Sequence, residues 1–241
     1  MRRPNINWKL ALVTALLFPL LLILGFWQLD REQEKREVEA LYEQRRNEPP
    51  RPLATVDWEA DDLAYVRVLV EGEFLNERNF LLDNRIMDSR VGYELITPLQ
   101  TDQGLLLVNR GWIPMGPSRQ QLPELPAVEG QVSLRGSLYV PFGEGLVLSA
   151  IQEQAAGVWP QVIQSLNVSF MEELLDGPFA DEPVLPYTLR VDPNESGAMQ
   201  AQWPVISMSP ETHRGYAVQW FTMAAVLLLL FTYISFRRDE D

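Results

Sequence analysis

The sequence contains no cysteine and only one histidine, His213. The absence of cysteine excludes disulfides, thiolate metal sites, iron–sulfur clusters and cysteine nucleophiles. A zinc site would lack partner ligands, and a Ser-His-Asp triad would have to use His213. There is also no Gly-rich phosphate loop and no internal repeat. We therefore predict that the protein is not an enzyme, because nothing supplies a positioned nucleophile or base.

Basic residues are few compared with acidic ones. The chain has 20 Lys and Arg against 33 Asp and Glu, which gives a formal net charge of −13. A nucleic-acid-binding protein needs a basic surface, so this balance argues against nucleic acid as a partner. The acidity alone identifies no other partner.

Charge is missing altogether from two long stretches near the chain ends. Residues 10–27 are apolar except for Thr14 and Pro19, and no charged residue occurs from Tyr216 to Phe236. At about 1.5 Å rise per residue, each stretch is long enough to cross a hydrocarbon core of roughly 30 Å. We predict transmembrane helices at residues 10–29 and 213–236. Pro19 is expected to kink the first helix without ending it.

The first apolar stretch can also be interpreted as a signal peptide, because Arg2 and Arg3 precede it. However, it is longer than a typical signal-peptide core of about 7–15 residues, and no small-x-small cleavage site follows it. Trp27 at its far end is typical of a membrane interface. These features favour an uncleaved helix.

Basic residues outside both predicted spans indicate the orientation. Arg2, Arg3 and Lys9 precede the first span, and two arginines follow the second in residues 237–241. By the positive-inside rule, residues 1–9 and 237–241 are cytoplasmic, although Arg31 and Lys35 count mildly against this. Two spans place the long intervening segment outside. We therefore predict a bacterial inner-membrane protein with a periplasmic domain.

Residues 30–48 are highly charged and contain no helix breaker, which predicts a helical stalk ended by the prolines at 49, 50 and 52. A domain over residues 53–208 follows. Alternating apolar residues and turn signals predict an α+β fold that is β-rich and mostly antiparallel. One short helix is expected at Val168–Leu175. The expected strands are Tyr65–Phe74, Asn79–Met87, Val91–Leu99, Leu105–Ile113, Val132–Val140, Gly145–Ser149, Val184–Val191 and Val205–Met208.

The first motif with functional interest is Leu107–Pro114, in which an apolar strand ends in Asn-Arg-Gly-Trp. Gly111 would allow a positive φ or a close approach of another backbone. Arg110 and Trp112 are residue types common in interface hot spots, which favours a partner-binding surface. The alternative is a structural strand end, with Trp112 in the core and Arg110 in a salt bridge.

The second motif is His213 and the helix face below it. Tyr216 and Trp220 lie three and seven residues further on, so they share its side of the helix. An aromatic belt at the membrane interface with an incidental histidine would explain the pattern. Alternatively, His213 is an axial ligand of a haem iron, with Tyr216 and Trp220 against the macrocycle and Arg214 near a propionate.

Four motifs together resemble the Surfeit-type (Shy-like) cytochrome c oxidase assembly proteins. They are Gly25–Arg31 with Lys35, Gly92–Leu99, Leu107–Pro114 and His213–Phe221. Their order also matches, and the resemblance covers nearly the whole chain.

The resemblance implies a chaperone of respiratory-chain biogenesis that binds haem a and aids its insertion into the catalytic subunit of a haem-copper oxidase. That subunit is the implied partner, and haem A synthase is a second candidate. Bacterial members are described as binding haem a through the histidine of the last motif, which is His213 here. Weak, single-sided ligation would suit transfer, although Met208 is near enough in sequence to be considered as a second ligand.

Two other functions stay open on the sequence. The external domain could act as a non-haem scaffold that stabilises oxidase assembly intermediates, with His213 structural. If the resemblance is set aside, an anchored periplasmic domain of a secretion or division complex fits the same topology.

Overall fold

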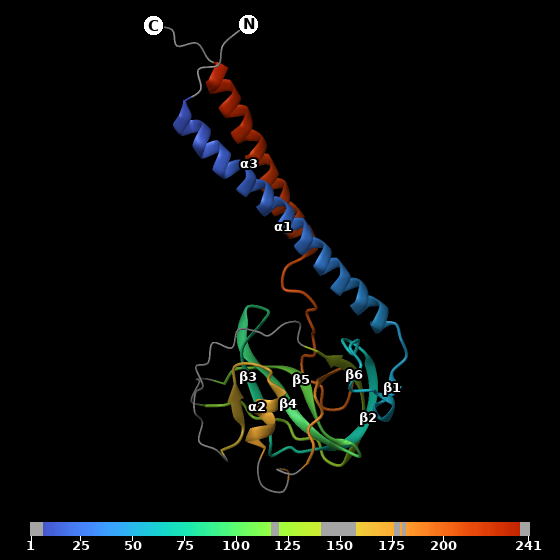
Figure 1. The fold of residues 1–241 in the computed structure, drawn as a ribbon. Helices are drawn as coiled ribbons and strands as arrows, with labels where there is room; N and C mark the ends of the chain where they lie inside the picture. Colours follow the sequence, from blue (N-terminus) through green and yellow to red (C-terminus); the bar gives the residue numbers. More distant parts are fainter. Residues whose placement is uncertain (1–6, 117–120, 141–157, 176–178, 180–181, 237–241) are drawn as a thin grey trace. The chain divides into compact units, whose positions relative to one another are not determined.

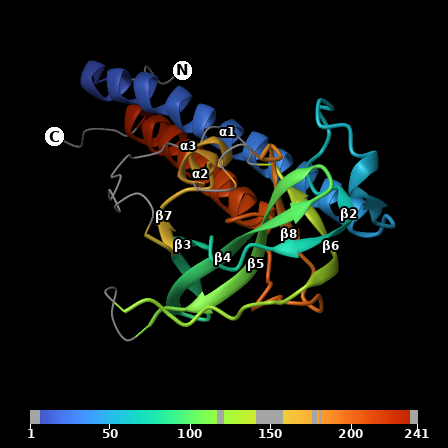
Figure 2. The same cartoon turned by 90° about the horizontal axis from the view of Figure 1, so that it is seen from below.

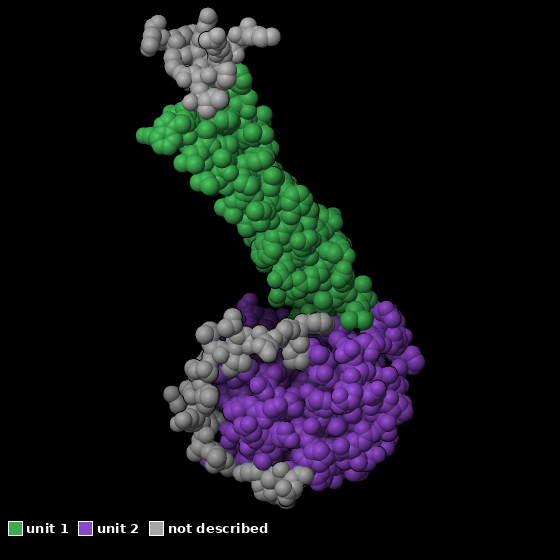
Figure 3. Space-filling model, in the orientation of Figure 1, with its two compact units in different colours: residues 1–42, 204–241 green, residues 43–203 purple. Residues whose placement is uncertain are grey.

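A computed structural model of the chain describes residues 7–116, 121–140, 158–175, 179 and 182–236. Figure 1 shows the order of the elements. The chain divides into two compact units, formed by residues 1–42 with 204–241 and by residues 43–203 (Figure 3). The two units are described separately.

Two long helices make up the first unit. Helix α1 runs from Trp8 to Arg46 and continues through Pro19, and helix α3 runs from Pro210 to Phe236. The last residues of α1 are grouped with the second unit. Both helices are long and apolar enough to cross a membrane, and many of their large apolar side chains are exposed. These properties fit a two-span membrane protein.

Small residues allow α1 and α3 to pack closely. A Cβ added to Gly25 would lie only 2.5 Å from the ring of Phe221, so the helices meet where α1 has no side chain. Phe221 also packs edge-to-face on Phe26, with 5.2 Å between ring centroids. Ala217 and Ala224 of α3 are buried as well. Close packing through small residues is typical of helix pairs in membranes.

Among the described residues, eight strands of the second unit form one sheet. They are β1 (Arg51–Pro52), β2 (Arg67–Phe74), β3 (Phe80–Met87), β4 (Arg90–Thr101), β5 (Gly104–Pro114), β6 (Gln131–Tyr139), β7 (Gln161–Ile163) and β8 (Thr188–Val191). The strand order is β1-β2-β6-β8-β5-β4-β3-β7, and β2 also pairs with β4. That extra pairing closes β2, β6, β8, β5 and β4 into a barrel (Figure 2).

Most of the strand pairs are antiparallel. Five pairs run antiparallel, and the three parallel pairs β1–β2, β3–β7 and β5–β8 each involve a short strand. The predicted α+β, β-rich and mostly antiparallel fold is confirmed.

Strand β5 is buried on both faces because two cores meet on it. Leu106 and Val108 belong to the barrel core, whereas Leu105 and Leu107 belong to a second cluster outside the barrel. Helix α2 (Val168–Leu174) covers this second cluster with Met171. Burial on both faces explains why β5 is an almost continuous apolar run in the sequence.

Most of the expected elements agree with the structure, and one does not. The short helix is present as α2 and begins after Asn167, whose side chain accepts a hydrogen bond from the Phe170 N–H. The expected strand Val205–Met208 was wrong, because this segment is an irregular connection to α3. It is a short apolar stretch between two prolines, with no strand pairing in the described part of the chain. The expected strand Gly145–Ser149 and the tail 237–241 lie outside the described residues.

Candidate functional site

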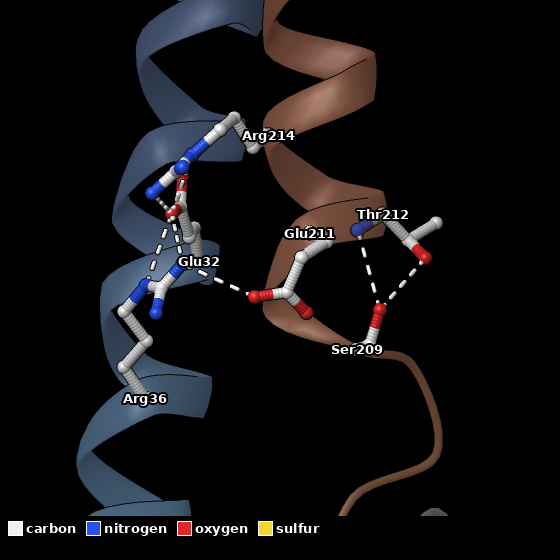
Figure 4. Close-up of polar contacts among 6 residues, drawn as sticks. All are labelled: Glu32, Arg36, Ser209, Glu211, Thr212 and Arg214. Atoms are coloured by element: carbon white, nitrogen blue, oxygen red, sulfur yellow. Dashed lines mark hydrogen bonds and ion pairs between the residues drawn. The ribbon is translucent and has the colours of Figure 1, made fainter.

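Helix α3 begins one turn before His213, and local sequence fixes that start. Ser209 precedes the helix, and its hydroxyl accepts from the Thr212 N–H at 3.4 Å and contacts the Thr212 hydroxyl at 3.0 Å (Figure 4). Pro210 occupies the first helical position, where its missing N–H costs nothing, and Glu211 follows near the positive end of the helix dipole. The start of the helix therefore sets where the His213 side chain lies.

His213 points into the packing between α3 and α1. Its side chain is 9% exposed, and its Nδ1 lies 2.8 Å from Oε1 of Gln28 on α1. Its Nε2 is buried and has no hydrogen-bond partner among the residues that the structure describes. One ring nitrogen is thus held by a polar contact, and the other is buried without a partner in the described part of the chain.

An ion-pair cluster joins α1 and α3 through Arg214, the residue that follows His213 (Figure 4). Glu32 of α1 is 6% exposed, and its Oε1 accepts from both Arg214 of α3 and Arg36 of α1, the latter at 3.0 Å. Arg36 also reaches Glu211 of α3 at 3.2 Å. Two carboxylates and two guanidinium groups therefore join the helices. A buried carboxylate needs such partners, because an unpaired charge would be strongly disfavoured there.

The four residues predicted to bind haem do not share one environment. His213 is buried, Tyr216 is 43% exposed, and Trp220 is half-buried. The indole Nε1 of Trp220, like Nε2 of His213, is buried and has no partner in the described part of the chain. Arg214 donates to Glu32 through Nε and Nη2, so its guanidinium is already engaged with a carboxylate.

The predicted partner residue Arg110 is buried at a β-bulge. Leu95 pairs with Gly111 and Ile96 pairs with Asn109, so Arg110 is the extra residue of β5. Gly111 follows with a φ of 114°, a conformation that favours glycine. The side chain of Arg110 is consequently 1% exposed.

Inside the domain, the Arg110 guanidinium donates three hydrogen bonds. Its acceptors are the Gly197 carbonyl at 2.8 Å, the Pro126 carbonyl at 2.9 Å and the Thr97 hydroxyl at 3.3 Å. It also lies 5.1 Å from the ring centroid of Phe74, a barrel-core residue. Burial lowers the pKa of Arg110 to about 10, which leaves it charged at neutral pH.

Trp112 is buried as well, at 3% exposure, and its indole N–H donates to the Arg85 carbonyl at 3.1 Å. The prediction that Arg110 and Trp112 form a surface for a partner was wrong, because neither side chain is accessible. The bulge turns the arginine inward to bind carbonyl groups. Nor does Arg110 form the salt bridge of the structural alternative, since its contacts among the described residues are to neutral groups.

Sequence reasoning missed Gln28 and Glu32, two α1 residues whose side chains bond to α3. A signal was present, because Gly25, Gln28 and Glu32 are three and four residues apart and so share one helix face. Gln28 and Glu32 are the polar residues of that face, at the point where the apolar span passes into the charged stalk. Polar side chains on the contact face of a membrane helix often bond to the neighbouring helix.

Two apolar terminal helices and a β-barrel domain inserted between them define a class of two-span membrane proteins. The chain belongs to the SURF1 family, whose family model matches residues 15–225. The match includes the whole barrel and the greater part of each helix.

Several curated relatives align along nearly the full chain. A SURF1-like protein of Monosiga brevicollis is 27% identical over 249 residues, which cover 97% of this chain and 88% of the relative. A SURF1-like protein of Rickettsia felis is 26% identical over 239 residues, covering 96% and 98%. A SURF1-like protein of Rickettsia bellii is 37% identical over 107 residues, which cover 43% of each chain.

Proposed function

We propose that this protein is an assembly factor for haem-copper cytochrome c oxidase that carries haem a as its cargo. It would receive haem a, with haem A synthase as the candidate source, and aid its insertion into the oxidase catalytic subunit. Membership of the SURF1 family supports the assembly role. The observation that carries haem binding is the buried Nε2 of the only histidine in the chain, which has no hydrogen-bond partner among the described residues.

The donor set of the site fits a haem iron in one respect. A neutral imidazole whose Nδ1 is hydrogen-bonded presents Nε2 as a metal ligand, which is the common arrangement in metal sites. Tyr216 and Trp220 supply aromatic surface on the same helix. Arg214 fits less well as a partner for a propionate, because Glu32 already accepts two of its donors.

The burial of His213 suits a carrier better than a permanent haem protein. Its Nε2 is covered, so neighbouring side chains would have to move before a ligand reached it. That rearrangement lowers the net affinity of the site by its own free energy. Single ligation through a covered nitrogen would hold the cargo weakly enough for release.

The proposed setting is the bacterial inner membrane, with both termini cytoplasmic and the barrel domain in the periplasm. The basic residues that flank both spans support this orientation. His213 would then lie at the periplasmic end of α3, near the outer membrane–water interface. An amphipathic porphyrin with propionate groups fits such a depth.

An optical spectrum tests haem binding. The full chain would be purified from membranes of cells that make haem A, together with His213→Ala and Val218→Ala prepared in parallel. Val218 is 59% exposed on the same helix, which makes it a matched control. We expect a haem a spectrum in the wild type and in Val218→Ala, and its loss in His213→Ala. Equal haem in all three would show that His213 is not the ligand.

A non-haem scaffold is the second candidate function. The hydrogen bond that Oε1 of Gln28 accepts and the close packing give His213 a structural role without any haem. The scaffold would capture oxidase intermediates through a surface other than Arg110 and Trp112. It predicts normal oxidase haem a content in His213→Ala cells, whereas delivery by His213 predicts a loss of that content.

A further inference from the structure

Gln28 is the residue of α1 whose side chain contacts a ring nitrogen of His213. The two residues are 185 positions apart, yet Oε1 of Gln28 lies 2.8 Å from Nδ1 of His213. The opposite ring nitrogen, Nε2, is buried with no partner among the described residues. The imidazole therefore has two unlike nitrogens, and the difference comes from the neighbouring helix.

The chemistry of the contact fixes the position of the proton. An amide oxygen only accepts hydrogen bonds, so the nitrogen that faces it must carry the hydrogen. In a neutral imidazole the other nitrogen then has a lone pair and no hydrogen. The environment of Nε2 agrees, because a buried N–H without an acceptor is rarer and more costly than a buried lone pair.

The Glu32 carboxylate is engaged by other groups. Glu32 lies one helical turn beyond Gln28 on α1, but its Oε1 is occupied by Arg36 and Arg214. The acceptor that faces the ring is consequently neutral. It orients the imidazole without placing a negative charge against the ring.

We propose that Gln28 is a positioning residue that selects the Nδ1–H tautomer of His213 and leaves Nε2 as the atom that binds iron. The inference rests on the proposed haem-carrying function for its purpose. The tautomer itself is a property of the haem-free chain. Residues that hold the second nitrogen of a metal-binding histidine typically change metal affinity by about 10–100-fold when they are replaced.

The first test needs no haem. Because the chain has one histidine, selective ¹⁵N-histidine labelling of the full chain in detergent micelles gives the nitrogen signals of His213 alone. At a pH where the ring is neutral, we expect a protonated Nδ1 and an unprotonated Nε2. Gln28→Met keeps the length of the side chain but removes the acceptor, and it should shift the population away from this tautomer. A protonated Nε2 in the wild type would overturn the inference.

A matched control is available on the same helix. Gln33 is exposed and donates only to Glu37 in the described contacts, so Gln33→Met should leave the His213 signals unchanged. Circular dichroism of both variants would verify that the helices remain folded. Identical His213 signals in Gln28→Met and the wild type would show that Gln28 does not select the tautomer.

The second test measures haem a binding and its reduction potential. Gln28→Met should weaken binding about 10–100-fold. Gln28→Glu should retain binding and lower the potential, since a carboxylate makes the imidazole a stronger donor. A merely structural Gln28 would not move the potential.

The outcomes separate this inference from the proposed function. If His213→Ala loses haem but both Gln28 variants keep the wild-type affinity and potential, the positioning role fails and haem binding stands. If the wild type takes up no haem, the proposed function fails. The tautomer measurement would then still decide whether Gln28 orients the ring.

Discussion

Replacing Arg110 by methionine and by lysine separates two opposing effects of burying a guanidinium. Its three hydrogen bonds stabilise the domain, because they satisfy the Gly197 and Pro126 carbonyls and the Thr97 hydroxyl. Removing its charge from water destabilises the domain. The lowered pKa of about 10, against the ordinary 12.5, puts that second effect at about 3 kcal/mol, using about 1.4 kcal/mol per pKa unit.

Arg110→Met removes both effects together. Two buried carbonyls lose their donor, at about 2 kcal/mol each, and the loss of the buried charge returns about 3 kcal/mol. Methionine also fills part of the space over Phe74. We therefore expect a modest loss of unfolding free energy, about 1–2 kcal/mol.

Arg110→Lys keeps the buried charge but loses the planar guanidinium group with its several N–H donors. One ammonium cannot reach three separate acceptors that a guanidinium spans, so about two charge-assisted bonds disappear. At about 2 kcal/mol each, the expected loss is about 4 kcal/mol. The chemically more conservative substitution should thus be the more damaging one.

Urea unfolding of the full chain in detergent micelles, followed by near-ultraviolet circular dichroism, measures this order. Arg135→Met is the control, because Arg135 is an exposed arginine whose pair with Glu195 should contribute less than about 1 kcal/mol. If Arg110→Lys were as stable as the wild type, or more stable than Arg110→Met, the assigned balance between hydrogen bonding and charge burial would be refuted.

Three further substitutions test other parts of the structure. Glu32→Gln should lower the thermal midpoint of the helix pair at low salt and reduce its salt dependence, because the carboxylate that Arg214 binds becomes neutral; Glu34→Gln, at an exposed pair, is the control. Gly111→Ala should destabilise the domain by at least about 2 kcal/mol in a urea titration, because a Cβ at φ 114° is strained and would lie 2.9 Å from a neighbouring backbone. Asn167→Ala should remove the cap of α2 and cost about 1 kcal/mol in the same assay.

The strands that could be predicted are those defined by a local sequence pattern. The predicted Val91–Leu99 and Leu105–Ile113 became β4 and β5, joined by a turn in which the Thr101 hydroxyl donates to the Gly104 carbonyl. Alternation and turn residues sufficed for these strands. Closure of the barrel could not be predicted, because the β2–β4 pairing joins residues that no local pattern relates.

Arg110 shows why a residue type is a weak guide to location. Arginine is mostly exposed in proteins, so a surface was the natural expectation for the Asn-Arg-Gly-Trp motif. The glycine in that motif was informative about backbone conformation. Its positive φ belongs to the bulge that makes Arg110 the extra residue of β5, and the arginine lies inside. The Gly197 and Pro126 carbonyls and the Thr97 hydroxyl make that burial tolerable, and they come from other segments of the chain.

His213 could be found by sequence because it is the single histidine and begins a long apolar run. The pairing of His213 with Gln28 could not be predicted, because the spacing on α1 shows a polar contact face but not which residue of α3 meets it. The predicted aromatic stripe assumed that haem lies against this face of α3. In the structure, the neighbour of the buried face is α1, and Tyr216 lies on the exposed side.

The ion pairs of Glu32 and the bond of Gln28 depend on the same helix register. Gln28 and Glu32 are one turn apart on α1, and His213 and Arg214 are adjacent on α3. Gln28 contacts His213, and Glu32 accepts from Arg214. A slip of one helical turn, about 5.4 Å, would break both contacts together. Burial of apolar surface gives little preference for one register where lipid surrounds the helices, so the fit of Phe221 against Gly25 and these polar contacts have to set it. The ion pair between Glu32 and Arg214 therefore affects His213 without touching it, because it fixes the axial position at which the Gln28 amide oxygen meets Nδ1.

It follows that Glu32→Gln should weaken the tautomer preference of His213, although this substitution changes no atom that touches the ring. Glu34→Gln should leave that preference intact.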